Sequence, residues 1–340
     1  MAHNHRFAFA GLIQQRQIHV TSVESIILKL QYQLQDTIPY YLQAIANADP
    51  IAVKNYLSQF PALAFAAFGT IKTYSGNTYQ NITGVQLAYL MNDPDIMRIL
   101  NATLKKSQPW IIENAQKQLF KKMLEVSQQK YLPLDFSLIV KAITADANIV
   151  ITYSENNFIK VRASSATEKL SAEFREKIKP RNISQGKSFI EQYLLAAYKI
   201  LEQHRSKWNR AKILWFQINI IAPLQSRVEK RCAQELTQGL SDLVLTGKPF
   251  DRSRKLINCI ENNAYKGIEI DFRGTSDGAL ILGRDYFIDI FYGAVTFNDY
   301  IHQDVELLEQ WATQKSQQMD DLIKELEISF VSKKPAGMKV

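Results

Sequence analysis

A short segment that occurs twice near the start of the chain constrains the fold more than any other feature of the sequence. Asp49 to Leu57 reads DPIAVKNYL, and Asp93 to Leu100, 44 residues further along, reads DPDIMRIL. In both copies the Asp can accept hydrogen bonds from the first backbone N–H groups of a helix, and the Pro takes a position where its missing N–H costs nothing. Apolar residues then recur at helical spacing. The repetition therefore predicts two helices that begin in the same way.

The residues in front of each copy resemble the start of an ankyrin repeat. Residues 82–89 read ITGVQLAY, which is similar to the Thr-Pro-Leu-His-Leu-Ala opening of that family, and residues 37–45 hold the equivalent place as TIPYYLQAI. The resemblance implies two degenerate ankyrin-like helix pairs. The residues in excess of the usual period of about 33 fall between Ala62 and Gln80. A helical bundle with the same spacing is the alternative.

Two helix pairs cannot bury their apolar faces alone, because about three such units are normally required. We expect a helix over Val20 to Leu34 to cover one side and a helix over Trp110 to Gln129 to cover the other. Repeat arrays bind partners through their concave face and loop tips, so we expect Tyr74, Tyr79 and Trp110 to contact a partner. These elements make up a domain at residues 20–131, after a disordered start at residues 1–19.

The pattern changes at residue 132 and predicts a mainly α-helical C-terminal domain, with small antiparallel β elements, up to residue 330. A β-hairpin signal covers residues 149–162, and a second β-like stretch covers residues 267–295. The expected helices span residues 134–145, 166–178, 186–215, 224–245 and 298–326, with Pro223 ending one of them. Residues 331–340 are expected to form a flexible tail. The overall fold class is mainly α (α+β).

The segments after the repeats resemble ankyrin-repeat effector proteins that intracellular bacteria inject through a type IVB secretion system. The resemblance covers about residues 49–284 and rests on Phe174-Arg175, Leu194 to Tyr198, Trp208, Leu214 to Phe216, Pro223-Leu224, Ala233 to Leu240 and Phe250 to Ser253. An acidic cluster of Asp320, Asp321, Glu325 and Glu327 is similar to the export signal of such effectors, and an ordinary charged helix end is the alternative. The resemblance implies a virulence-related protein that moves from the bacterial cytoplasm to the host cytosol and binds a host protein there.

Composition narrows the possible partners. The net charge is +8, and residues 101–250 carry 24 basic and 13 acidic side chains. Such a surplus can attract anionic lipid or nucleic acid, although an ordinary solvated surface is the simpler interpretation. Two cysteines, Cys232 and Cys259, argue against a disulfide scaffold. No apolar run is long enough to cross a membrane.

One catalytic signature is present. Gly274 to Gly278 reads GTSDG and fits the G-x-S-x-G nucleophile elbow, with Ser276 as nucleophile. Asp285 or Asp289 and then His302 follow in the order of a Ser-Asp-His triad. A tight hairpin turn is the simpler interpretation, because the residues that follow are strand-like.

Cys232 with His204 or His302 makes a second candidate nucleophile and base, against the ordinary packing role of a helix cysteine. The sequence carries none of the common metal or nucleotide motifs, and we expect no cofactor and no metal. We therefore expect an interaction protein, with a hydrolase or cysteine-dependent enzyme as the alternative.

Overall fold

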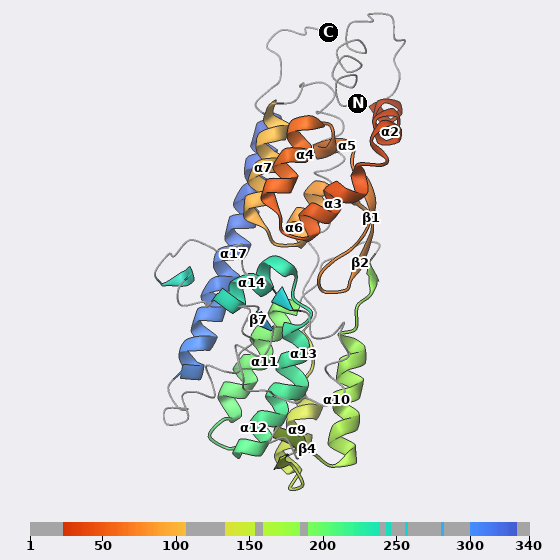
Figure 1. Ribbon diagram of the computed structural model, residues 1–340. Coiled ribbons are helices and arrows are strands. Elements are labelled where there is room, and N and C mark those ends of the chain that lie inside the picture. Colours follow the sequence, from red (N-terminus) through yellow and green to blue (C-terminus); the bar gives the residue numbers. More distant parts are fainter. Residues whose placement is uncertain are drawn as a thin grey trace, which may run out of the picture.

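The computed structural model describes residues 23–106, 133–153, 159–183, 190–238, 243–245, 256–257, 280–281 and 300–331. Within these residues the protein is mainly α-helical with small sheets, as predicted (Figure 1). Residues 23–106 form an N-terminal lobe, and residues 133–153, 159–183 and 190–238 form a helical body. The long helix α17 (Tyr300–Val331) runs along both, which gives the molecule an elongated shape.

The N-terminal lobe contains two helix pairs that turn in the same way. The first pair is α3 (Ile38–Ala46) with α4 (Pro50–Gln59), and the second is α6 (Gly84–Leu90) with α7 (Pro94–Lys106). Ala48 and Asn92, at equivalent places in the two turns, both have φ of 52°. Helix α3 contacts α6 and α4 contacts α7. The repeated sequence therefore produces a repeated unit that stacks on itself.

The predicted helix starts are confirmed. Asp49 Oδ1 accepts a hydrogen bond from the N–H of Ala52 at 2.9 Å, and Asp93 Oδ1 accepts one from the N–H of Ile96 at 3.2 Å. Thr83 forms a capping box at the start of α6. Its Oγ1 accepts from the N–H of Gln86, and Gln86 Oε1 accepts from the N–H of Thr83, both at 3.1 Å. The matching Thr37 at the start of α3 makes no such side-chain bond.

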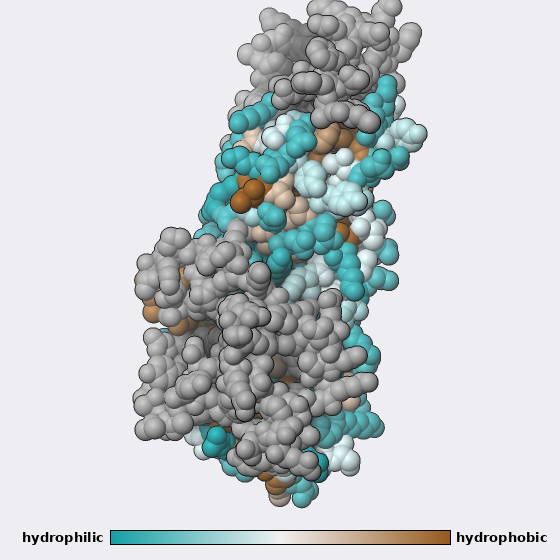
Figure 2. Space-filling view, in the orientation of Figure 1, coloured by the Kyte–Doolittle hydropathy of each residue, from teal (hydrophilic) through white to brown (hydrophobic). Residues whose placement is uncertain are grey.

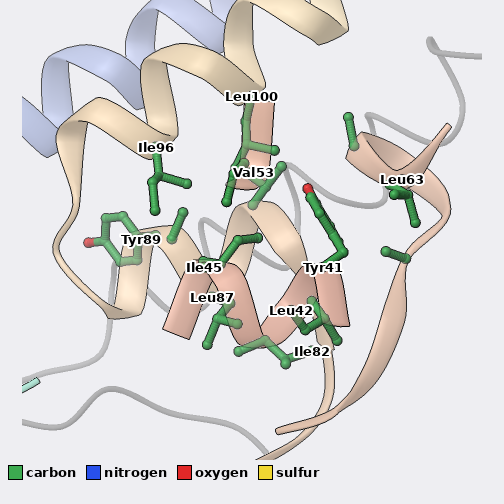
Figure 3. Close-up of a cluster of buried hydrophobic side chains, with 14 of the residues drawn as sticks. Tyr41, Leu42, Ile45, Val53, Leu63, Ile82, Leu87, Tyr89, Ile96 and Leu100 are labelled. Carbon is green, nitrogen blue, oxygen red and sulfur yellow. The ribbon is translucent and has the colours of Figure 1, made fainter. Parts of the chain in front are cut away.

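The core of the lobe lies between the four helices (Figure 3). Its labelled members are Tyr41, Leu42, Ile45, Val53, Leu63, Ile82, Leu87, Tyr89, Ile96 and Leu100. Helices α3 and α6 come close together where Gly84 faces Tyr41. A Cβ atom at Gly84 would lie 2.6 Å from Tyr41 Oη, so this contact requires a residue without a side chain.

A β-hairpin lies between the two helix pairs, in the region where the sequence indicated only extra residues and a loop. After the short helix α5 (Leu63–Ala66), strands β1 (Phe68–Lys72) and β2 (Thr78–Thr83) pair in antiparallel fashion. Strand β5 (Asn182–Ile183) of the body adds to β2 in parallel. The hairpin thus extends the N-terminal lobe into the body.

The two sides of the stacked pairs are covered by helices from opposite ends of the chain. Helix α2 (Val23–Leu34) contacts α5, close to the range predicted for the first cover. On the other side, α17 contacts α7 and contributes four buried residues to the lobe's core. These are Met319, Leu322, Ile323 and Leu326. The second predicted cover, Trp110 to Gln129, lies outside the described residues.

The helical body begins with elements that match the sequence prediction closely. Helix α9 (Ser137–Ala145) leads into the predicted hairpin, whose strands are β3 (Val150–Tyr153) and β4 (Ile159–Arg162). Helix α10 (Ser165–Lys177) follows. A second hydrophobic core fills the body, and Val305, Leu308 and Trp311 of α17 belong to it.

The prediction of one helix over residues 186–215 is wrong. Helix α11 (Ile190–His204) ends before α12 (Arg210–Phe216) begins. The break is local: the side chain of Asn209 accepts a hydrogen bond from the N–H of Lys212 at 3.0 Å and starts a new helix.

The expected break at Pro223 is also wrong. Helix α12 continues through the π-helical segment η1 (Gln217–Ile221) into α13 (Ala222–Gln225), which contains Pro223. A π turn shifts the hydrogen-bond pattern by one residue, so the missing N–H of a proline is tolerated immediately after it. Helix α14 (Lys230–Gln238) follows, and β6 (Leu256–Ile257) pairs in parallel with β7 (Leu280–Ile281).

Candidate functional site

The tip of the β1–β2 hairpin, residues 73–77, is held inside the protein by the body. Thr73 Oγ1 and Ser75 Oγ donate to Glu229 Oε1 at 3.0 and 2.7 Å. Arg227 Nη1 donates to the carbonyl oxygen of Ser75 at 3.3 Å, and the N–H of Arg181 donates to Asn77 Oδ1 at 3.1 Å. We call this hairpin tip with residues 229–235 and Lys315 the junction, because it joins the N-terminal lobe to the rest of the molecule.

Glu229 is the ionisable group at the centre of the hairpin contact. Only 2% of the residue is exposed. Burial raises the pKa of this carboxyl to about 7, and the nearby charge of Glu191 also acts in that direction. The hydroxyl groups of Ser75 and Thr73 work against this rise, because they donate hydrogen bonds to the carboxylate. The result is a buried acid that changes charge near neutral pH.

The predicted partner-contact loop is not at the surface. Tyr79 is 1% exposed, and burial together with the charge of Glu229 raises the pKa of its phenol well above the ordinary value. Tyr74 is partly buried and packs against the core of the body. Repeat loops bind partners when their tips project into solvent, whereas this tip is already occupied by residues of the same chain. Trp110, the third residue of that prediction, lies outside the described residues.

A second group of buried charges at the junction centres on Glu235. Its two oxygens accept hydrogen bonds from Arg231 Nε at 2.8 Å, from Lys315 Nζ at 2.5 Å and from Trp311 Nε1 at 2.9 Å. Arg231 Nη1 also lies 3.4 Å from Asp95 Oδ2. The charges therefore link α7, α14 and α17, and each buried ion has an oppositely charged neighbour.

None of these charged residues was singled out from the sequence, and Lys315 is the one whose position in the sequence is unusual. It is buried, and its ammonium lies 5.2 Å from the centre of the Trp311 ring. The sequence contains an indication that Lys315 is buried, because this residue lies at helical spacing between Trp311 and Met319 on the apolar side of α17. A charge at a core position of an amphipathic helix indicates a buried partner.

Cys232 lies beside this group of charges. Lys315 Nζ donates to its Sγ at 3.7 Å. Burial raises the pKa of the thiol well above its ordinary value, although the Lys315 ammonium acts against the rise. His204 lies elsewhere, stacked on the Trp208 ring with 5.0 Å between ring centres. A buried, protonated thiol is a poor nucleophile, and the described residues do not bring Cys232 and His204 together as a nucleophile and its base.

The described residues do not include the serine hydrolase candidate. Ser276 and Asp289 lie outside the described residues, and so does Asp285. His302 falls in the first turn of α17, and its side chain is not described.

In the part of the chain that the structure describes, no group of three or more His, Cys, Asp or Glu side chains is arranged to hold a metal ion. Nor does any helix in those ranges have the length and apolar character needed to cross a bilayer.

Large apolar side chains are exposed on the first three described helices. Leu28 and Tyr32 lie one turn apart on α2, Tyr40 is on α3 and Ile51 is near the start of α4. Tyr32 has the largest exposed fraction, 75%. Figure 2 shows the surroundings: pale and brown side chains interrupt the hydrophilic surface of the N-terminal lobe.

These exposed helix faces are the second candidate site, and they are not signalled by any motif. Comparison with protein-family models, with curated proteins and with solved structures finds no match for this chain.

Proposed function

We propose that this protein is an interaction module that binds another protein through the exposed faces of α2, α3 and α4. One observation carries the proposal. The stacked helix pairs leave Leu28, Tyr32, Tyr40 and Ile51 in solvent, whereas the acids, lysine and thiol of the junction are buried and bonded to one another. Tyrosine is enriched at protein interfaces, where it supplies a large contact area with few rotatable bonds.

The junction supports this proposal through rigidity. A binding surface that is already ordered loses less conformational entropy when its partner binds. The contacts of the hairpin tip with Glu229 and of Arg231 with Asp95 fix the N-terminal lobe against α14. The exposed helices are therefore presented on a fixed support.

The resemblance to type IVB effectors extends the proposal to the partner, which would be a host protein met after injection. A reporter enzyme fused to the N-terminus tests this part. We expect transfer into host cells from a bacterium with a working type IVB system and none from a strain whose system is disabled. Equal transfer from both strains would refute secretion through the type IVB system but would not affect the proposed binding surface.

Site-specific crosslinking tests the binding surface. A photoreactive amino acid replaces Tyr32 or Tyr40 in the full chain, and Leu138 of α9 provides a matched control. Leu138 is also exposed and apolar, but it lies on the helical body. We expect positions 32 and 40 to crosslink the same partner from host lysate and position 138 not to do so.

Competition decides whether the crosslink reports specific binding. Unlabelled wild-type protein should reduce the yield at positions 32 and 40, whereas protein carrying Tyr32→Ala and Tyr40→Ala should compete at least tenfold less well. Equal crosslinking at all three positions, or equal competition by the two proteins, would contradict the proposed surface.

A further inference from the structure

The turn between α11 and α12 forms a basic corner at the end of the body farthest from the N-terminal lobe (Figure 1). Arg205, Lys207, Arg210 and Lys212 fall within eight residues, with no acidic residue among them. Lys207 and Arg210 are exposed. Lys212 is half-buried and donates to the carbonyl oxygen of Thr144 at 2.7 Å, so its charge remains in place beside α9.

The β3–β4 hairpin adds to this corner. Helix α12 contacts both of its strands. Arg162 lies directly opposite Val150 in the antiparallel register, so their side chains share one face of the hairpin. Both are exposed, Val150 by 47%. The neighbouring pair turns the other way, because Val161 packs against the core of the body. The basic corner is therefore Arg162, the four basic residues of the turn, and Val150.

Three acidic groups of the described residues near the corner are engaged inside the protein. Asp146 accepts hydrogen bonds from Ser164 Oγ at 2.6 Å and from Thr167 Oγ1 at 2.7 Å. Glu168 accepts one from Trp215 Nε1 at 2.9 Å, and Glu202 also interacts within the protein, as do Arg205 and Arg210 of the corner itself. The charged side chains of the corner that are exposed, Arg162, Lys207 and Arg210, are all basic.

We propose that the basic corner is a docking surface for membranes that carry anionic phospholipids. Lys and Arg held near such a surface each strengthen binding by about fivefold. The exposed Val150 lies beside Arg162 and can enter the boundary between head groups and acyl chains, as apolar residues do in peripheral membrane proteins. The corner is the end of an elongated molecule, so it can meet a flat surface without interference from the N-terminal lobe.

Nucleic acid fits the corner less well. Binding to single strands relies on exposed aromatic rings on which bases stack. The aromatic residue of the corner, Trp208, is only 5% exposed. It stacks on His204 and donates from Nε1 to Thr144 Oγ1 at 3.0 Å. The ring therefore packs inside the body and is not exposed for a base to stack on it.

This inference goes beyond the proposed function, because the corner and the exposed helices α2, α3 and α4 lie at opposite ends of the molecule. A chain docked through the corner would keep those helices directed away from the membrane. The two surfaces are tested by separate experiments, so one proposal can be refuted without affecting the other.

Vesicle co-sedimentation tests the docking surface. Full-length protein is mixed with vesicles of phosphatidylcholine alone or with 30% phosphatidylserine, at 50, 150 and 500 mM NaCl. The variant K207E/R210E reverses two charges of the corner. The control K54E/K72E makes the same change in net charge at exposed lysines of the N-terminal lobe.

We expect binding to the phosphatidylserine vesicles only, a steep loss with salt, and a loss of at least twentyfold in K207E/R210E with less than threefold in the control. Equal loss in both variants would show that net charge alone is responsible and would overturn the proposal. So would the absence of binding at 50 mM NaCl, or release of bound protein by an equimolar single-stranded RNA.

Discussion

Replacing Glu229 with Gln should change how the stability of the protein depends on pH. The folded-state pKa of this buried carboxyl is about 7, against an ordinary value of 4.5. The folded protein therefore holds the proton more tightly than the unfolded chain. Its contribution to stability is fully present below pH 4.5 and is lost as the pH rises through 7.

The size of the effect follows from the difference between the two pKa values. Each pKa unit corresponds to about 1.4 kcal/mol, so ionisation of Glu229 lowers the free energy of unfolding by about 3 kcal/mol between pH 4.5 and pH 8.5. Gln keeps an oxygen that can accept from Thr73 and Ser75 but carries no charge. We expect E229Q to match the wild type near pH 4.5 and to be more stable by up to about 3 kcal/mol at pH 8.5.

Urea denaturation at several pH values, followed by tryptophan fluorescence and circular dichroism, measures this difference. Glu173→Gln is the control, because it makes the same chemical change at an exposed residue of α10. Parallel stability curves for wild type and E229Q across this range would refute the argument. An E229Q protein that is less stable than the wild type at pH 8.5 would refute it as well.

Two further predictions concern side chains that fix other parts of the fold. Lys315→Met should lower the free energy of unfolding by about 3 kcal/mol, because it leaves the buried Glu235 carboxylate with one cation fewer, and adding Glu235→Gln should restore part of the loss in urea denaturation. Thr83→Ala should cost about 1 kcal/mol by removing the cap of α6, whereas Thr37→Ala, at the equivalent position without a side-chain cap, should cost clearly less. Equal losses for the two threonines, or a K315M protein as stable as the wild type, would contradict these predictions.

The elements that the sequence predicted well are those whose causes are local. The Asp-Pro pairs at residues 49 and 93 start helices through bonds within their own first turn. The β3–β4 hairpin likewise depends on two short β-rich segments close together in the chain. Such signals need no knowledge of the rest of the fold.

Apart from the break before α12, whose cause is the local cap at Asn209, the errors come from interactions between distant segments. Tyr79 belongs to a polar loop that looks exposed in the sequence, but Glu229 lies 150 residues away along the chain and covers it. Pro223 is tolerated because the helix before it adopts π geometry inside the core, which no local signal indicates. The junction was missed for the same reason, since its charges become partners only when α7, α14 and α17 meet.

The long helix α17 has a consequence for the order in which the protein can fold during synthesis. The N-terminal lobe ends at residue 106, yet the buried residues Met319 to Leu326 that complete its core are made more than two hundred residues later. At typical rates of translation the ribosome needs about ten seconds or more to reach them. During that interval the apolar side of α7 has no α17 to cover it, and apolar surface that is exposed during folding is prone to non-native contacts.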